Sequence, residues 1–97
     1  MTKLDSVTRA GDGTHKWKAV FTREDGRKKT TYFGASGMDD YTITHDQEQR
    51  ARYRDRHRKD LITNDPTKAG YLSYYILWGD STSFQKNLSA YKNRFNL

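Results

Sequence analysis

Residues 16–33 read KWKAVFTREDGRKKTTYF and place two runs of strand-favouring residues on either side of Asp25-Gly26. An aspartate-glycine pair between such runs is a strong signal for the tight turn of a β-hairpin. In the first run the apolar residues Trp17, Ala19 and Phe21 alternate with two lysines and a valine, which is the period of a half-buried strand. The stretch therefore predicts an antiparallel hairpin with one face in the core and one basic face.

The residues before the hairpin contain one further run with strand character, from Leu4 to Arg9. We expect this run to pair as a third strand, so that residues 1–12 form either an edge strand or a flexible arm. After the hairpin, the glycines of Gly34-Ala35-Ser36-Gly37 interrupt the sheet and allow a turn. The chain shows no repeat and no interdomain linker, which predicts one small domain over residues 1–97.

The second half of the chain predicts helices. An arginine-rich helix is expected from about His45 to Leu61, because Thr44 and Gln47 have the spacing of a capping box. A second helix is expected from Pro66 to Trp78, with Asp65 as its cap, since proline is favoured at the first helical position. The apolar stripe of this second helix makes it the expected centre of the core.

A third helix is expected from Ser83 to about Phe95, where apolar residues recur every three or four positions. Thr82 and Gln85 have the capping spacing at its start. Together these elements predict an α+β fold, with an N-terminal antiparallel β-hairpin or three-stranded sheet packed on about three C-terminal helices.

The composition predicts a thin core, because only 33% of the 97 residues are apolar and 31% are charged. Seven Tyr, four Phe and two Trp nevertheless supply enough large rings for a folded domain. The absence of cysteine excludes disulfides, a thiolate nucleophile and zinc-cysteine sites. No apolar run approaches the roughly 20 residues of a membrane span, so no membrane span is expected.

Basic side chains concentrate between Gln47 and Asp60, where five arginines, one lysine and one histidine accompany three acids. The whole chain carries a formal net charge of +6, which favours an acidic partner. Arg50, Arg54 and Arg58 recur at a spacing of four, so they share one side of a helix, and this side is predicted to meet carboxylates or phosphates. We therefore expect that replacing these three arginines together weakens partner binding without unfolding the domain.

Tyr53, His57 and Leu61 form a neighbouring stripe and are predicted to be the contact of this helix with the core. The alternative is that the helix presents only a solvated face, on which pairs such as Glu48–Arg52 support helicity. The residues predicted to bind the partner or a phosphate are Arg50, Arg52, Arg54, Arg56, Arg58, Lys59, Lys16, Lys18 and Lys28.

The histidines and several aspartates are the groups that a small metal-dependent nuclease would use. They are His15, His45, His57, Asp39, Asp40 and Asp46. His57 lies three helical turns beyond His45, so these groups are not expected to share one metal site. We predict no catalytic residues, no metal and no cofactor, and a nuclease is kept as a remote alternative only.

Several motifs follow one another after residue 15: Phe33-Gly34, Asp40-Tyr41-Thr42, the basic helix with RYRDRHRKD, Asp65-Pro66, and the segment from Gly70 to Trp78. In this arrangement the chain resembles a family of small, basic, uncharacterised proteins encoded by large nucleocytoplasmic DNA viruses of algae and amoebae. The resemblance implies a viral setting, with the protein in the virion and, before assembly, inside the host cell in the cytoplasm or virus factory. It implies no catalytic residues, and family membership alone does not assign a function.

Two functions are compatible with these observations. The first is a non-enzymatic structural protein, a minor capsid or virion-associated component that binds acidic surfaces of other capsid or virion proteins through the arginine-rich helix. The second is a largely non-sequence-specific DNA-binding protein of the viral genome, favoured by the basic charge and the hairpin lysines. The mixture of acidic and basic residues favours the structural protein over the DNA-binding protein.

Overall fold

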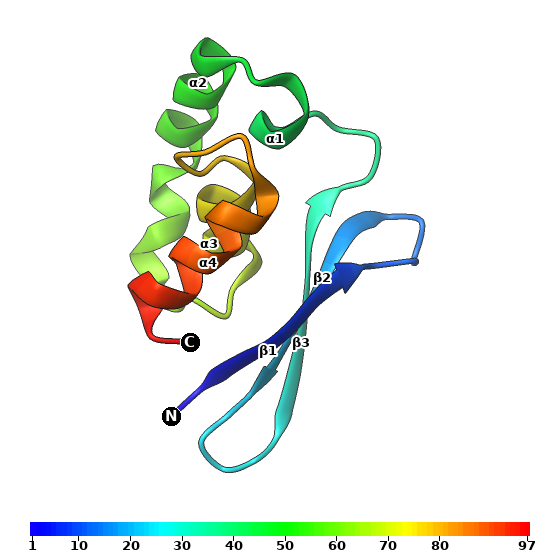
Figure 1. Ribbon diagram of the computed structural model, residues 1–97, viewed down its shortest axis with the longest axis vertical. Helices are drawn as coiled ribbons and strands as arrows, with labels where there is room; N and C mark the ends of the chain where they lie inside the picture. The colour runs from blue at the N-terminus through cyan, green and yellow to red at the C-terminus, as the bar shows by residue number, and fades with distance from the viewer.

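The computed structural model describes all residues from 1 to 97 and confirms the expected fold class. Three antiparallel strands, β1 (Lys3–Arg9), β2 (His15–Thr22) and β3 (Lys28–Ala35), form one sheet in the order β1-β2-β3. In Figure 1 the helices lie together on one side of this sheet, and the β2–β3 hairpin extends beyond them at the bottom of the view. The molecule is elongated, with principal extents of 41 × 27 × 23 Å.

The predicted hairpin turn is present at residues 23–27. The amide of Arg23 donates to the carbonyl of Arg27 over 2.8 Å, and Gly26 has a φ of 84°, a value that glycine adopts without steric cost. The strand register then pairs Thr22 with Lys28 and Trp17 with Phe33. The run from Lys3 to Arg9 is the edge strand that pairs with β2.

Six helical segments follow the sheet. They are α1 (Tyr41–Thr44), α2 (Gln47–His57), the 3-10 segment η1 (Arg58–Thr63), α3 (Ala69–Leu72), the π-helical turn η2 (Ser73–Leu77) and α4 (Phe84–Phe95). α3 and η2 are continuous, so they form one helical stretch over residues 69–77. None of these helices has both the length and the apolar character that crossing a membrane requires.

The predicted start of the arginine-rich helix is wrong by two residues. Thr44 and Gln47 do not form a capping box, because Thr44 ends the one-turn helix α1, which is capped by Asp40. The N-cap of α2 is Asp46, whose carboxylate accepts from the amides of Glu48 (3.0 Å) and Gln49 (3.1 Å). Asp46, which lies directly before the helix start, therefore takes the role predicted for the threonine. The regular helix also ends earlier than predicted, at His57, and continues as 3-10 turns.

The other two predicted caps are shifted as well. Asp65 does not cap a helix that starts at Pro66. It accepts from the amide of Thr67 over 2.9 Å in a local turn, and the helix begins only at Ala69. At the last helix the cap is Ser83 rather than Thr82, because the Ser83 hydroxyl accepts from the amide at the third helical position.

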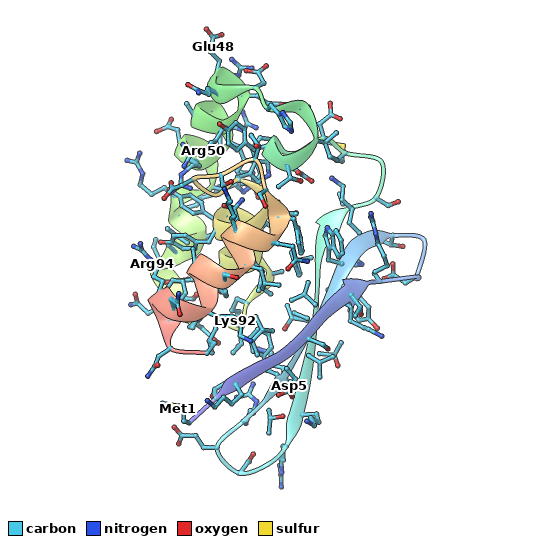
Figure 2. All side chains as sticks on the ribbon, viewed as in Figure 1. Met1, Asp5, Glu48, Arg50, Lys92 and Arg94 are labelled. Carbon is cyan, nitrogen blue, oxygen red and sulfur yellow. The ribbon has the colours of Figure 1, made fainter.

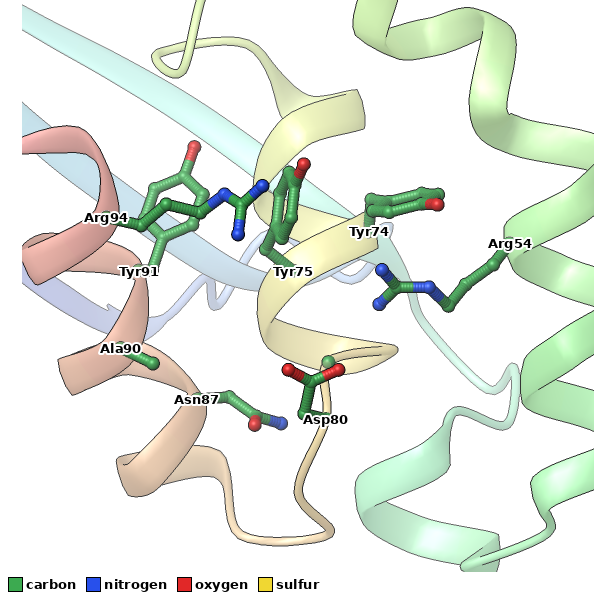
Figure 3. Close-up of a pocket in the computed structure, with 9 residues that line it drawn as sticks. Arg54, Tyr74, Tyr75, Asp80, Asn87, Ala90, Tyr91 and Arg94 are labelled. Atoms are coloured by element: carbon green, nitrogen blue, oxygen red, sulfur yellow. The ribbon is translucent and has the colours of Figure 1, made fainter.

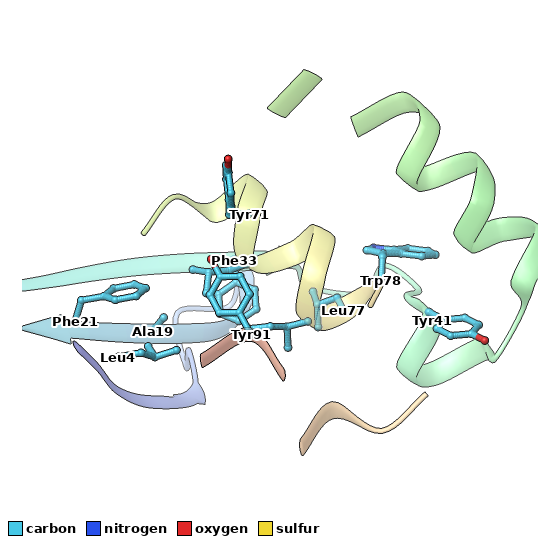
Figure 4. Close-up of a cluster of buried hydrophobic side chains, with 11 residues drawn as sticks. Leu4, Ala19, Phe21, Phe33, Tyr41, Tyr71, Leu77, Trp78 and Tyr91 are labelled. Carbon is cyan, nitrogen blue, oxygen red and sulfur yellow. The ribbon is translucent and has the colours of Figure 1, made fainter. Parts of the chain in front are cut away.

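The core lies between the sheet and the helical stretch 69–77. Figure 4 shows Ala19, Phe21 and Phe33 of the sheet facing this stretch, with Tyr91 of α4 alongside. The largest fully buried side chains include Tyr91, Phe21, Phe33, Leu72, Ile76 and Leu77. Aromatic rings thus compensate for the low share of aliphatic residues, as the composition predicted.

Candidate functional site

The arginine-rich helix α2 contains no buried residue, and it packs on the rest of the domain through a stack of rings. The Tyr53 ring lies 4.3 Å from the Trp78 ring at 9° and 4.1 Å from the His57 ring at 20°. Burial, reinforced by the charge of Asp60, raises the pKa of the Tyr53 hydroxyl to about 12. Tyr53 and Leu61 pack against the core, in line with the stripe expected from the sequence.

Arg50 and Arg54 do not face an outside partner, so this part of the predicted binding side is wrong. Arg50 donates from Nε to the carbonyl of Gly79 over 2.7 Å and from Nη2 to Asp80 over 2.8 Å. Arg54 donates from Nη1 to the carbonyl of Trp78 over 2.8 Å. Both arginines therefore attach α2 to the C-terminal end of the helical stretch 69–77, where carbonyl groups have no helical partner.

A shallow hollow of about 190 Å³ surrounds the Arg54 side chain. Figure 3 shows Arg54 reaching from α2 and Arg94 reaching from α4 toward two tyrosines of η2. The Arg54 guanidinium lies 4.1 Å from the centre of the Tyr74 ring, and that of Arg94 lies 4.9 Å from the centre of the Tyr75 ring. These cation–π contacts hold three helical segments together, which makes the hollow mainly a packing feature.

Two of the three predicted lysines of the hairpin are occupied within the domain. Lys16 pairs with Asp40 at 2.7 Å, and its side chain is only 11% exposed, so it adds no free charge to the surface of the hairpin. Lys28 lies 3.0 Å from Asp5 but keeps much of its side chain in solvent. Lys18 makes no ion pair and is half-buried on β2. The basic face expected on the hairpin is therefore largely neutralised.

Four basic residues of α2 and η1 remain exposed to solvent. Arg52, Arg56 and Lys59 follow one another at spacings of four and three, and none of them forms an ion pair. Arg58 is 73% exposed and lies 3.6 Å from Asp55, a separation that allows only a weak surface interaction. We call Arg52, Arg56, Arg58 and Lys59 the outer basic face. In Figure 2 side chains of α2 project from the upper left of the molecule, away from the sheet.

The histidines and aspartates considered for a nuclease do not converge on one metal site. His15 Nδ1 lies 2.9 Å from Asp12, and His57 Nδ1 lies 2.9 Å from Asp60. His45 ends α1 in the left-handed conformation, with φ at 56°. No group of three such residues is placed to hold a metal ion. Each imidazole is thus a member of a local pair or a helix end.

Sequence reasoning missed the internal role of the inner arginines. The sequence spacing did indicate this role, because Arg54 directly follows Tyr53 and Arg50 lies three positions before Tyr53. Both arginines therefore lie beside the Tyr53 ring, which contacts the core. Long arginine side chains can reach past such a ring to carbonyl groups behind it. What the sequence could not indicate is that the residues after η2 would offer those carbonyl groups.

Comparison with known proteins gave one result. A family model described as "Family of unknown function (DUF5754)" matches residues 6–57, which is more than half of the chain. The matched segment contains the second half of β1, the strands β2 and β3, and the helices α1 and α2. No match was found among curated proteins or among solved structures.

Proposed function

The chain belongs to DUF5754, a family of unknown function, and we propose from its geometry that it is a non-enzymatic structural protein that binds acidic surfaces of partner proteins. One observation supports this proposal above all others. Arg52, Arg56 and Lys59 of the outer basic face form no ion pair and Arg58 has only a weak contact with Asp55, whereas the inner arginines of the same helix are bonded to the domain. The helix therefore separates an attachment side from a side that is free to bind.

The attachment side gives the outer basic face a fixed position. Two arginine contacts and the stack of Tyr53 on Trp78 hold α2 against the helical stretch 69–77. A partner that binds the outer basic face consequently orders only side chains and not the backbone, which lowers the entropic cost of association. Three of the four residues are arginines, whose planar groups pair with carboxylates through two parallel hydrogen bonds.

The charge pattern favours a protein partner over DNA. Glu48 and Asp55 are exposed on the same helix, and each would repel a neighbouring phosphate. A protein surface can place its own cations opposite these acids and its carboxylates opposite the arginines. The hairpin lysines Lys16 and Lys28, which would have widened a DNA-binding surface, are paired with aspartates.

The sequence resemblance implies a viral setting, which specifies the role that we propose. In that setting the protein is a minor capsid or virion-associated component, and the acidic partner is another capsid or virion protein. Its position can be tested in purified particles. Retention in shells whose genome has been removed by nuclease supports this role, and loss together with the genome contradicts it.

A titration distinguishes a protein partner from DNA. The protein is titrated with polyglutamate and with a random-sequence duplex at roughly 50 and 200 mM salt. We expect saturable binding to polyglutamate and weak binding to the duplex. The DNA-binding alternative would be established instead by two results together. The duplex would bind more tightly than polyglutamate, and its affinity would fall by roughly a hundredfold between the two salt concentrations, as four phosphate contacts require.

A further inference from the structure

A second hollow, of about 480 Å³, lies between the connection from β3 to α1, helix α2 and the π-helical turn η2. We propose that this hollow binds a single small oxyanion, a carboxylate or a phosphate group. Apart from Arg56, its lining is separate from the outer basic face, so the proposal goes beyond the function argued above. It is supported by an excess of unused hydrogen-bond donors among the lining side chains.

The first unused donor is the indole N–H of Trp78. Trp78 lines the hollow and is only 6% exposed, and its N–H donates to no acceptor of the chain. Every fully buried side-chain nitrogen and oxygen of the protein has a hydrogen-bond partner, so this unpartnered N–H must be in part accessible from outside the core. An indole N–H can only donate, and a ligand that satisfies it must therefore bring an acceptor.

The second donor group is the ammonium of Lys16. One of its N–H groups donates to Asp40 Oδ2 over 2.7 Å, and an ammonium has three. The other carboxylate oxygen of Asp40 already accepts from the amide and the hydroxyl of Thr42. The two other N–H groups of Lys16, whose side chain is 11% exposed, donate to no acceptor in the protein.

Helix α2 supplies two more donors along the same hollow. Arg56 is exposed and makes no ion pair, so it contributes a full positive charge. The amide oxygen of Gln49 accepts from Thr44, which leaves its NH₂ group.

The lining contains only one carboxylate without a hydrogen bond, that of Asp39, which is exposed. Free donors thus outnumber free acceptors, which favours an acceptor-rich ligand. Because the charges of Lys16 and Asp40 cancel, Arg56 alone attracts the anion, and Asp39 opposes it. This balance suits one small oxyanion and disfavours a polyanion. The volume lies within the usual range of ligand sites, about 300–1,000 Å³, and the rings of Tyr53 and Trp78 add an apolar part to the lining.

The two tryptophans make the test specific. Trp78 lines the hollow, whereas Trp17 lies on the sheet, stacked on Phe84 at 4.3 Å. Their two indole N–H resonances, assigned with a Trp17→Phe variant, are followed by nuclear magnetic resonance during titration with acetate or inorganic phosphate at constant ionic strength. We expect the Trp78 resonance to shift saturably while that of Trp17 stays in place. The anion that saturates at the lower concentration identifies the chemistry of the natural group.

Variants assign the effect to the hollow. Arg56→Gln is expected to weaken anion binding by roughly tenfold or more, and Asp39→Asn is expected to strengthen it. Arg52→Gln, one turn away on the same helix and identical in charge change, is expected to leave it unchanged. The proposal is overturned if the Trp78 resonance does not shift up to roughly 50 mM of either anion, a concentration far above a millimolar Kd. It is equally overturned if the resonances of both tryptophans shift alike. It is also overturned if Arg52→Gln weakens binding as much as Arg56→Gln does. The titration contains no partner protein, so a negative result would not affect the proposed function.

Discussion

The guanidinium of Arg54 lies 4.1 Å from the centre of the Tyr74 ring while one of its N–H groups donates to a main-chain carbonyl 2.8 Å away. A helix without a single buried residue is thereby fixed to the domain through a cation–π contact and a charged hydrogen bond. The basic residues of α2 therefore have two roles: those on one side attach the helix to the domain, and those on the other side remain exposed to solvent.

Removing the Arg54 contact should destabilise the domain. Arg54→Gln loses the cation–π contact and weakens the hydrogen bond to Trp78, which we expect to lower the free energy of unfolding by about 1–3 kcal/mol. Arg52→Gln on the outer basic face is the matched control and should stay within about 0.5 kcal/mol of wild type. Urea unfolding followed by tryptophan fluorescence measures both. Equal midpoints for the two variants would show that Arg54 is not an attachment residue.

The buried pair of Lys16 and Asp40 should be strongly coupled. Lys16→Met leaves the Asp40 carboxylate, which is 2% exposed, without a counter-charge, and is expected to cost about 3–5 kcal/mol. Asp40→Asn combined with Lys16→Met should recover part of that loss, because asparagine still caps α1 and carries no charge. A double-mutant cycle from denaturant unfolding gives the coupling energy. Additive effects of the two substitutions would contradict the predicted pairing.

Two glycines with similar positive φ angles should respond differently to alanine. Gly34 and Gly37 have φ values of 76° and 80°, so each Gly→Ala change should cost about 1–2 kcal/mol. At Gly34 the new Cβ would also lie 2.9 Å from Cδ1 of Leu77, whereas at Gly37 it would meet no atom. Gly34→Ala should therefore be the more destabilising by at least about 1 kcal/mol. Thermal unfolding of both variants measures the difference, and equal losses would refute the close packing of β3 on η2.

The stability should fall in alkaline solution. The Tyr53 hydroxyl has a pKa of about 12 in the folded protein against 10.0 for the free side chain, and burial also raises the pKa of Tyr91. At a pH between 10.0 and about 12, the Tyr53 hydroxyl has lost its proton in the unfolded chain but keeps it in the folded chain. Unfolding therefore becomes more favourable as the pH rises. Denaturant unfolding at pH 8, 10 and 11 should show constant stability up to about pH 10 and a decline above it. For Tyr53→Phe the decline should be smaller, and an identical decline would show that Tyr53 does not contribute.

The sheet could be predicted from the sequence because its signals are local. The Asp25-Gly26 turn and the alternation around Trp17 each act over a few residues, and the observed register follows from them. The helix starts were predicted less accurately, because Thr44 and Asp46 are both good caps and only the adjoining helix α1 decides between them.

The direction of the basic side chains could not be predicted in the same way. Helical spacing indicates that Arg50 and Arg54 share a side, but it does not indicate whether that side faces solvent or the domain. The answer depends on the carbonyl groups of Trp78 and Gly79, which lie more than twenty residues away in sequence. The second hollow was missed for the same reason, because residues from four separate segments line it.

The central claim is that the outward charges of α2 and η1 bind the partner while the inward charges hold the fold. The most direct measurement compares two triple variants of equal charge change in their affinity for polyglutamate and in their unfolding midpoint. The first replaces Arg52, Arg58 and Lys59 by glutamine, and the second replaces Lys3, Arg23 and Arg27, which are exposed on the edge strand and at the hairpin turn. We predict that the first variant loses tenfold or more in affinity, corresponding to roughly 1.4 kcal/mol or more, with an unchanged midpoint, and that the second retains its affinity. Equal losses in the two variants would mean that binding depends on net charge alone, and would contradict the assignment of a binding face to α2 and η1.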